Sequence, residues 1–229
     1  MNTILKHSLP RRALALLCAL LLCASAVAAS SNALRAYAEY TPPPALTALW
    51  QINHDVIAGL FIPGTDIGYP ILLHPTQDDY YLNVCIDGTE GYPGSIYTNK
   101  IEGADFNTFN TVIYGHNMRD GSYFGSLKYF RDPAFLAAHR EIDIYTPSAR
   151  RVYTIFAVVS YGDRRITDLF DDNNPDDRAA FLETLKAADD SILLTDVPVS
   201  TEGHIITLST CISEQHDNRL LVVAAERSW

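Results

Sequence analysis

Short runs of hydrophobic residues, separated by polar turns, dominate the chain after its first quarter. The runs are rich in β-branched and aromatic residues, and Gly, Pro, Asn and Asp stand between them, as is typical of β-strands and their connections. Many short strands with few helices favour a mainly β fold in one domain, a closed or nearly closed β-barrel. The pattern predicts strands at Leu60–Ile62, Gly94–Thr98, Thr111–Tyr114, Glu141–Thr146, Arg151–Tyr161, His204–Ser209 and Leu220–Glu226.

Two segments carry helical signals instead. Within Ala45–Ala58 the apolar residues recur at roughly helical spacing, and Gly59 follows as a helix terminator. Further along, Asn174 and Pro175 supply an N-cap and a proline at the first helical position. We therefore expect one helix before the first strand and a second through Arg178–Ala188.

An apolar segment lies near the beginning of the chain. No residue of Ala13–Ala29 is charged, and three basic residues precede it, which is typical of a signal peptide or a membrane anchor. As a helix it would be about 25 Å long, near the minimum for crossing a bilayer, so its length leaves both possibilities open. We divide the chain into a signal or anchor segment (1–29), a proline-containing linker (30–44) and one folded domain (45–229).

Composition narrows the possible partners and the use of cysteine. The chain has 27 acidic and 17 basic residues and a formal net charge of −10 at pH 7, so we expect no nucleic-acid partner. Two of the four cysteines lie in the apolar segment. Cys85 and Cys211 remain in the domain, too few for a disulfide framework, although these two thiols could pair with each other.

Three residues at the ends of predicted strands are candidates for chemistry. Cys211 ends the run HIITLSTC and faces a polar segment, where a thiol can be both positioned and reachable. His116 follows Gly115 just after a strand, which places it on a loop. Arg219 opens the last strand eight positions after Cys211, so antiparallel pairing would bring the two together. Taken singly, each residue has an ordinary structural explanation.

Together the three residue types suit acyl transfer through a thioester. A thiol with a pKa of about 8.5 is mostly protonated at neutral pH, so it needs a neighbouring imidazole or cation to become a thiolate. The imidazole can then protonate a leaving amine. A guanidinium can stabilise the oxyanion of the tetrahedral intermediate, an effect commonly worth about 3 kcal/mol per donor. Phosphate-binding, dinucleotide, zinc-protease and serine-hydrolase motifs are absent from the sequence, and no cofactor is implied.

Three segments resemble the active-site motifs of sortases, the enzymes that attach exported proteins to the cell wall of Gram-positive bacteria. They are, in chain order, YGHNM (114–118), TLSTC (207–211) and NRLLVVA (218–224). The resemblance extends over most of positions 45–229. It includes the segments DYYLN (79–83) and PGSIY (93–97), and the expected helix at about 175–188 is similar to class B sortases in particular.

This resemblance implies an eight-stranded barrel in which Cys211 is the nucleophile, His116 its acid/base partner and Arg219 the oxyanion stabiliser. Cys211 would attack the carbonyl of a Thr within a short C-terminal sorting signal of an exported protein. Ser209 and Thr210 resemble positions that line the substrate groove. Similarity to class B implies an NP-type signal rather than an LP-type one. No metal is expected, because calcium binding belongs to another sortase class.

The resemblance also implies an acceptor and a location. An amine of a peptidoglycan precursor or cross-bridge would resolve the thioester. Sortases usually keep an N-terminal anchor with the catalytic domain outside the cell. We therefore expect a single anchor within residues 1–29, in the cell membrane, and an extracellular catalytic domain.

The sequence leaves several alternatives open. A pilin-polymerising sortase would use the same machinery with a lysine of another protein subunit as the acceptor. A thiol protease would let water resolve the thioester. A non-catalytic surface binding domain could keep the same barrel, but a purely adhesive domain has no physical need for all three candidate residues. The resemblance identifies no acidic partner for His116, and Asp217 is left without a role.

Overall fold

The computed structural model describes residues 40–213 and 215–227. The chain divides into two units, Met1–Thr41 and Pro42–Trp229, and the fold described below is that of the second. The predicted signal or anchor segment and most of the predicted linker lie outside the described residues. Within those residues, no helix combines the length and the apolar character needed to cross a membrane.

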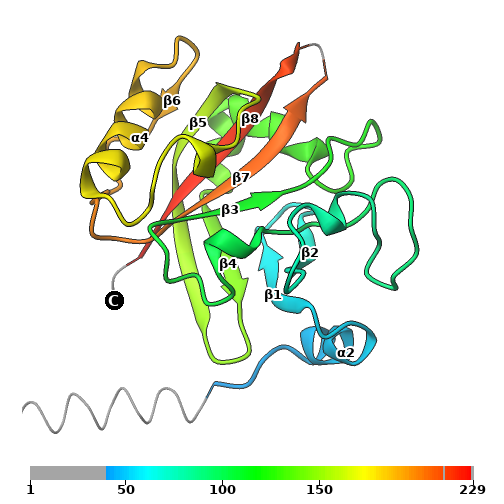
Figure 1. The fold of residues 1–229 in the computed structure, drawn as a ribbon. Coiled ribbons are helices and arrows are strands. Elements are labelled where there is room, and N and C mark those ends of the chain that lie inside the picture. Colours follow the sequence, from blue (N-terminus) through cyan, green and yellow to red (C-terminus); the bar gives the residue numbers. More distant parts are fainter. Residues whose placement is uncertain (1–39, 214, 228–229) are drawn as a thin grey trace, which may run out of the picture. The chain divides into compact units, whose positions relative to one another are not determined.

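A single sheet of eight strands organises the described part of the chain (Figure 1). Its order is β2-β1-β4-β5-β8-β7-β3, with β6 paired to β5 beside this path. Neighbouring strands are antiparallel except β3 and β7, which are parallel. The bounds are β1 Val56–Phe61, β2 Gly68–Leu72, β3 Asn110–Tyr114, β4 Glu141–Tyr145, β5 Arg150–Gly162, β6 Ile192–Leu193, β7 Ile205–Ile212 and β8 Gln215–Glu226.

The two ends of the sheet, β2 and β3, are linked by an irregular segment. Leu72 donates its N–H to the carbonyl of Ile96 (3.0 Å) and accepts from the N–H of Thr98 (3.0 Å). Between them, Tyr97 exchanges both backbone hydrogen bonds with Tyr114 of β3 (3.1 and 2.8 Å). The prediction of a mainly β, nearly closed barrel is confirmed. The predicted strand Gly94–Thr98 is wrong in detail, because this segment forms isolated bridges to both sheet ends.

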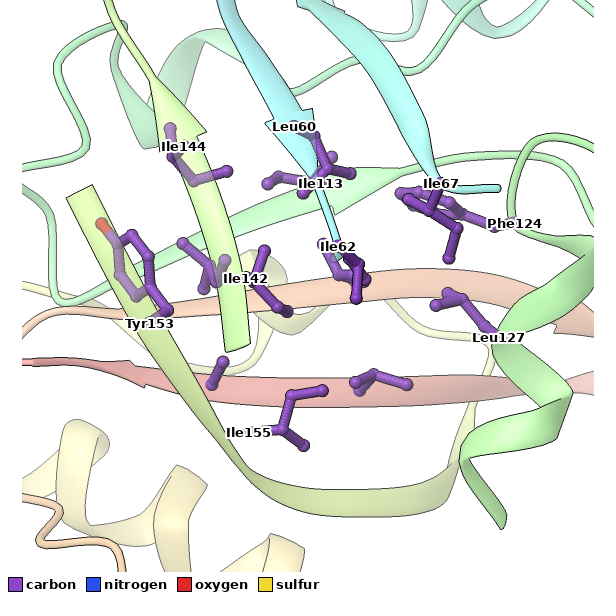
Figure 2. Packing of buried hydrophobic residues seen from close by; sticks show 14 of the residues in the cluster. Leu60, Ile62, Ile67, Ile113, Phe124, Leu127, Ile142, Ile144, Tyr153 and Ile155 are labelled. Carbon is purple, nitrogen blue, oxygen red and sulfur yellow. The ribbon is translucent and has the colours of Figure 1, made fainter. Parts of the chain in front are cut away.

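The barrel interior is filled by branched aliphatic and aromatic side chains. Figure 2 shows these side chains meeting from several strands and from the segment after β3 that contains Phe124 and Leu127. Burying each large side chain contributes about 1.5–3 kcal/mol, so this interior is a main source of the barrel's stability. The labelled members are Leu60, Ile62, Ile67, Ile113, Phe124, Leu127, Ile142, Ile144, Tyr153 and Ile155.

A second core lies on the other face of β5 and β8, under helix α4 (Pro175–Ala187). Phe181 and Leu185 of this helix are buried there. The helix begins as predicted, with Pro175 at its first turn and the Asn174 side chain accepting from the N–H of Asp176 (3.0 Å). Because both faces of β5 are covered, its central residues are apolar without alternation.

The first helix is shorter than the sequence predicts. Helix α2 spans Pro44–Ile52, and Asn53 ends it in an extended conformation. The Asn53 side chain accepts the N–H of Asp55 (2.9 Å), a turn that competes with further helix. Residues 56–58, which were assigned to the helix, therefore belong to β1, where their alternating burial fits a strand.

Several short elements were not predicted. They have few residues and weak periodicity, so neighbouring packing decides their structure. The unpredicted elements are the strands β2 and β6, the helix α3 Pro133–Ala138, and the 3₁₀ turns η1 Tyr80–Leu82, η2 Lys100–Glu102, η3 Gly125–Arg131 and η4 Ile166–Asp168.

Candidate active site

Cys211 lies near the end of β7, directly opposite Arg219 of β8. The strand register pairs these two residues, as the short connection between them predicted. A shift in register follows between Cys211 and Ile212, so regular pairing stops at the cysteine. The side chain of Cys211 is exposed, whereas β7 is buried from Ile205 through Thr210. The strand thus fixes the backbone of a thiol that solvent can reach.

His116 is brought to the same place by the parallel pairing of β3 with β7. Tyr114 pairs with Ser209, and the N–H of Gly115 donates to the Ser209 carbonyl (3.2 Å). The hydroxyl of Thr210 donates to the Gly115 carbonyl (2.7 Å). His116 and Cys211 each lie two residues beyond the Tyr114–Ser209 pair, so the parallel register brings both to the same end of the sheet.

Gly115 lets the turn after β3 pack closely against Ile96 and Phe124. A Cβ atom at position 115 would lie 2.3 Å from Cδ1 of Ile96 and 2.7 Å from Cδ2 of Phe124. Phe124 also donates its N–H to the carbonyl of His116 (3.0 Å). The turn that carries the imidazole is therefore packed tightly against the barrel.

Asn117 is a site residue that the sequence reasoning missed. Its side-chain amide donates to the carbonyl of Cys211 (2.8 Å) and to the hydroxyl of Ser213 (2.9 Å). The histidine loop and the end of the cysteine strand are thereby tied together. Its place directly after His116 in the sequence was the only available signal.

Two contacts hold the His116 ring in place. Its Nε2 atom lies 3.0 Å from the carbonyl oxygen of Leu82. The ring of Tyr92 lies 4.9 Å away, centroid to centroid, at an interplanar angle of 62°. Both partners come from the long connection between β2 and β3, whose part in the site was unforeseen.

One cavity of about 200 Å³ joins all the candidate residues. His116, Cys211 and Arg219 line it together with Ser209 and Thr210, the two predicted substrate-groove positions. Ser209 and Thr210 are 6% and 3% exposed, so they shape the wall mainly through their backbone and buried side chains. The remaining lining residues are Asp79, Leu82, Tyr97, Tyr114, Gly115, Asp163 and Arg165.

An ion pair between Asp79 and Arg165 forms part of the cavity wall. The Asp79 carboxylate also accepts from the hydroxyl of Tyr97 (3.1 Å) and from the side-chain amide of Asn99 (3.2 Å). These contacts join the start of the DYYLN segment to the connection between β5 and α4. The pair presents a carboxylate and a guanidinium close to an otherwise aromatic wall.

The aromatic wall consists of Tyr97 and Tyr114, whose rings stack at 5.4 Å with an interplanar angle of 26°. Burial raises the pKa of both phenols well above the usual value, so they remain neutral at physiological pH. Glu102 contributes to both shifts, because at the high pH where a phenolate would form its carboxylate is charged and repels the phenolate.

The cysteine alternatives are also resolved. Cys85 and Cys211, the two cysteines in the part of the chain that the structure describes, are both free thiols. Cys85 is half-buried, and it does not line the cavity that contains Cys211.

Comparison with known proteins gives one consistent result. The family model described as the Sortase domain matches residues 60–227. A curated relative, sortase B of Listeria monocytogenes, is 34% identical over 174 residues, which cover 74% of this chain and 68% of the relative.

Two solved structures are similar over most of the chain. The Staphylococcus aureus sortase B–substrate complex has a TM-score of 0.69 at 25% identity, covering 86% of this chain and 91% of that one. A Streptococcus pyogenes class B sortase involved in pilus biogenesis has a TM-score of 0.67 at 28% identity, covering 79% of this chain and 97% of that one.

Proposed function

Because this chain belongs to the sortase family of cysteine transpeptidases, we propose that it cleaves a C-terminal sorting signal and transfers the acyl group to a cell-wall amine. The observation that carries the proposal is the shared cavity of Cys211, His116 and Arg219. These residues come from three neighbouring strands or their ends, and they are the types that thioester chemistry requires.

In this proposal Cys211 is the nucleophile. It loses its proton to His116, and the thiolate attacks the backbone carbonyl carbon of the scissile peptide bond. Arg219, opposite Cys211 on the neighbouring strand, donates hydrogen bonds to the oxyanion of the tetrahedral intermediate. The C–N bond then breaks, the leaving amine takes the proton from His116, and a thioester remains on Cys211.

The second half of the reaction reverses the proton transfers. An incoming amine attacks the thioester carbonyl and gives a proton to His116, and the sulfur leaves as a thiolate. We propose that the amine belongs to a peptidoglycan precursor or cross-bridge. The exposure of Cys211 supports access by such a second substrate.

The sorting signal would lie in the cavity beside Ser209 and Thr210. The substrate complex of S. aureus sortase B, a structure with the same fold, supports the binding of a peptide to this kind of barrel. Similarity to class B supports an NP-type pentapeptide over an LP-type one.

A pilin-polymerising reaction is the second candidate. It is favoured by the similarity to the S. pyogenes class B sortase involved in pilus biogenesis. The chemistry at Cys211 would be unchanged, and the acceptor would be a lysine amine of another protein subunit. A non-catalytic binding domain would not need Cys211, His116 and Arg219 to share one cavity.

A screen of fluorogenic pentapeptides, with and without candidate amines, tests the proposed function. Wild type is expected to cleave an NP-type peptide and, when an amine is supplied, to form the amide product. Cys211→Ala is expected to have no activity, and Cys85→Ser serves as the matched control that keeps it. Cleavage that persists in Cys211→Ala contradicts the mechanism, and hydrolysis alone in the presence of every amine supports a protease instead.

A further inference from the structure

One of the two ring nitrogens of His116 already has a hydrogen-bond partner. Its Nε2 atom is engaged by the carbonyl oxygen of Leu82 at 3.0 Å, a hydrogen-bonding distance. A carbonyl can only accept a hydrogen bond, so the hydrogen in this contact must belong to Nε2. In a neutral imidazole the other nitrogen, Nδ1, then carries the lone pair.

The Leu82 carbonyl packs closely against Gly94. Gly94 has a φ of +67°, and a Cβ atom there would lie 2.4 Å from the Leu82 oxygen and 2.5 Å from the Tyr81 oxygen. Next to it, the N–H of Ser95 donates to the Tyr81 carbonyl (2.9 Å). The hydroxyl of Tyr123 in turn donates to the Gly94 carbonyl (3.2 Å). The close packing of Gly94 and these hydrogen bonds thus restrict the position of the Leu82 carbonyl.

Tyr92 restricts the ring from a second direction. Its ring meets the His116 ring at 4.9 Å and 62°, an edge-to-face arrangement that such pairs favour. Tyr92 is 65% exposed, so its ring contributes little to the core. Its contact with His116 is therefore one that can be removed without disturbing the barrel interior.

We propose that the Leu82 carbonyl and the Tyr92 ring hold His116 in the tautomer protonated at Nε2, which makes Nδ1 the nitrogen that exchanges protons with Cys211. Leu82 and Tyr92 are thus positioning residues, which act through His116. The consequence for catalysis rests on the proposed function, whereas the tautomer is a property of the folded protein alone.

The proton balance follows from this assignment. In the first step the S–H bond of Cys211 breaks and an Nδ1–H bond forms, giving a thiolate and an imidazolium. The imidazolium keeps its Nε2 hydrogen on the Leu82 carbonyl throughout. When the peptide C–N bond breaks, the amine nitrogen takes the hydrogen from Nδ1, and the ring returns to its starting tautomer.

Nitrogen-15 NMR of histidine-labelled full-length protein tests the tautomer directly. The Cys211→Ala chain is used, so that no thiol exchanges protons with the ring, at a pH about two units above the usual histidine pKa of about 6.5. Signals of His116 are assigned by their loss in Cys211→Ala carrying His116→Asn in addition. We expect the protonated-nitrogen shift at Nε2 and the unprotonated one at Nδ1. The opposite pattern overturns the proposal, whether or not the enzyme sorts proteins.

Two variants of Tyr92 test its part in positioning. Tyr92→Ala is expected to give a mixture of His116 tautomers by NMR and to lower kcat about three- to tenfold, with a smaller change in KM. Tyr92→Phe keeps the ring and is expected to match the wild type in both measurements. If Tyr92→Ala leaves tautomer and kcat unchanged, the positioning role of Tyr92 is wrong. Loss of activity without a tautomer change likewise contradicts it.

Discussion

The residues near the end of the cysteine strand differ sharply in exposure. Ser209 and Thr210 are buried and bound to the residues that lead to His116, whereas Cys211 is exposed. Cys211, His116 and Arg219 could be predicted from the sequence, because each lies at the end of a recognisable strand and thioester chemistry needs a thiol, an imidazole and an oxyanion donor. The contacts of Asn117 and Leu82 could not, because they depend on loop conformations that have no periodic signal.

Arg219 gives the first residue-scale prediction. If its guanidinium stabilises the oxyanion, Arg219→Ala is expected to lower kcat by about 10²–10³-fold with a smaller effect on KM, because the contact forms mainly in the transition state. Steady-state kinetics with a cleavable pentapeptide measure this.

Arg227→Ala is the matched control for Arg219. Arg227 follows the same strand at its other end, where it forms an ion pair with Glu141 (2.7 Å). Its replacement is expected to leave kcat unchanged, because exposed ion pairs contribute little to folding stability. An equal loss of kcat in the two variants would show that replacing Arg219 lowers activity by destabilising the fold, and not by removing a contact with the oxyanion.

Glu102 gives a prediction about stability and pH. It is 2% exposed, and neither carboxyl oxygen has a hydrogen-bond partner among the described residues. Burial raises the pKa of Glu102 from 4.5 to about 8, so the folded protein holds this carboxyl neutral at pH 7.

The sign of the effect follows from proton linkage. Between about pH 4.5 and pH 8 the unfolded chain has lost the Glu102 proton and the folded chain has kept it, so stability falls as pH rises. The slope is up to about 1.4 kcal/mol per pH unit. Glu102→Gln is expected to match the wild type near pH 4 and to become progressively more stable than it toward pH 8. Denaturant unfolding of both proteins across this range measures the difference, and parallel curves would contradict the assigned protonation state.

At the scale of elements, three neighbouring strands build the site. The parallel pair β3–β7 and the antiparallel pair β7–β8 bring together residues that are far apart in the sequence. All three strands are recognisable from their apolar runs, and the short connection correctly predicted the β7–β8 pairing. The parallel pairing of β3 could not be predicted, because periodicity reports burial and not which strand lies beside which.

Gly115→Ala tests how tightly this arrangement is packed. The new methyl group would overlap Ile96 and Phe124, so we expect a loss of about 1–3 kcal/mol in unfolding free energy and a lower kcat, because His116 is displaced. Gly162→Ala at the end of β5 is the control, since nothing lies within 4 Å of a Cβ atom there. Denaturant midpoints and kinetics of both variants check this, and similar behaviour of the two would show that the turn tolerates expansion.

At the scale of the whole molecule, the barrel is nearly closed and carries a second core under α4. The mainly β class followed from the alternation of short runs. The family resemblance added the number of strands. The end of the first helix was predicted wrongly, because the apolar residues of β1 continue the helical spacing and the turn at Asn53 is a local hydrogen-bonding effect.

The N-terminal segment gives a prediction about localisation. We propose that residues 1–29 remain attached as an anchor and keep the catalytic domain at the outer face of the cell membrane, as their apolar stretch and preceding basic residues indicate. Mass spectrometry of the protein recovered from the membrane fraction is expected to find the intact N-terminus. A mature form that starts near Ala29 would instead identify a cleaved signal peptide.

The most direct test of the central claim is the intact mass of the enzyme during turnover. Wild type mixed with a cleavable sorting peptide, without an added amine, is expected to gain the mass of the peptide's N-terminal acyl part. Fragmentation should locate the adduct on Cys211, and an added amine should remove it as an amide product. Cleavage that leaves Cys211 unmodified, or an adduct located on Cys85, would contradict the account.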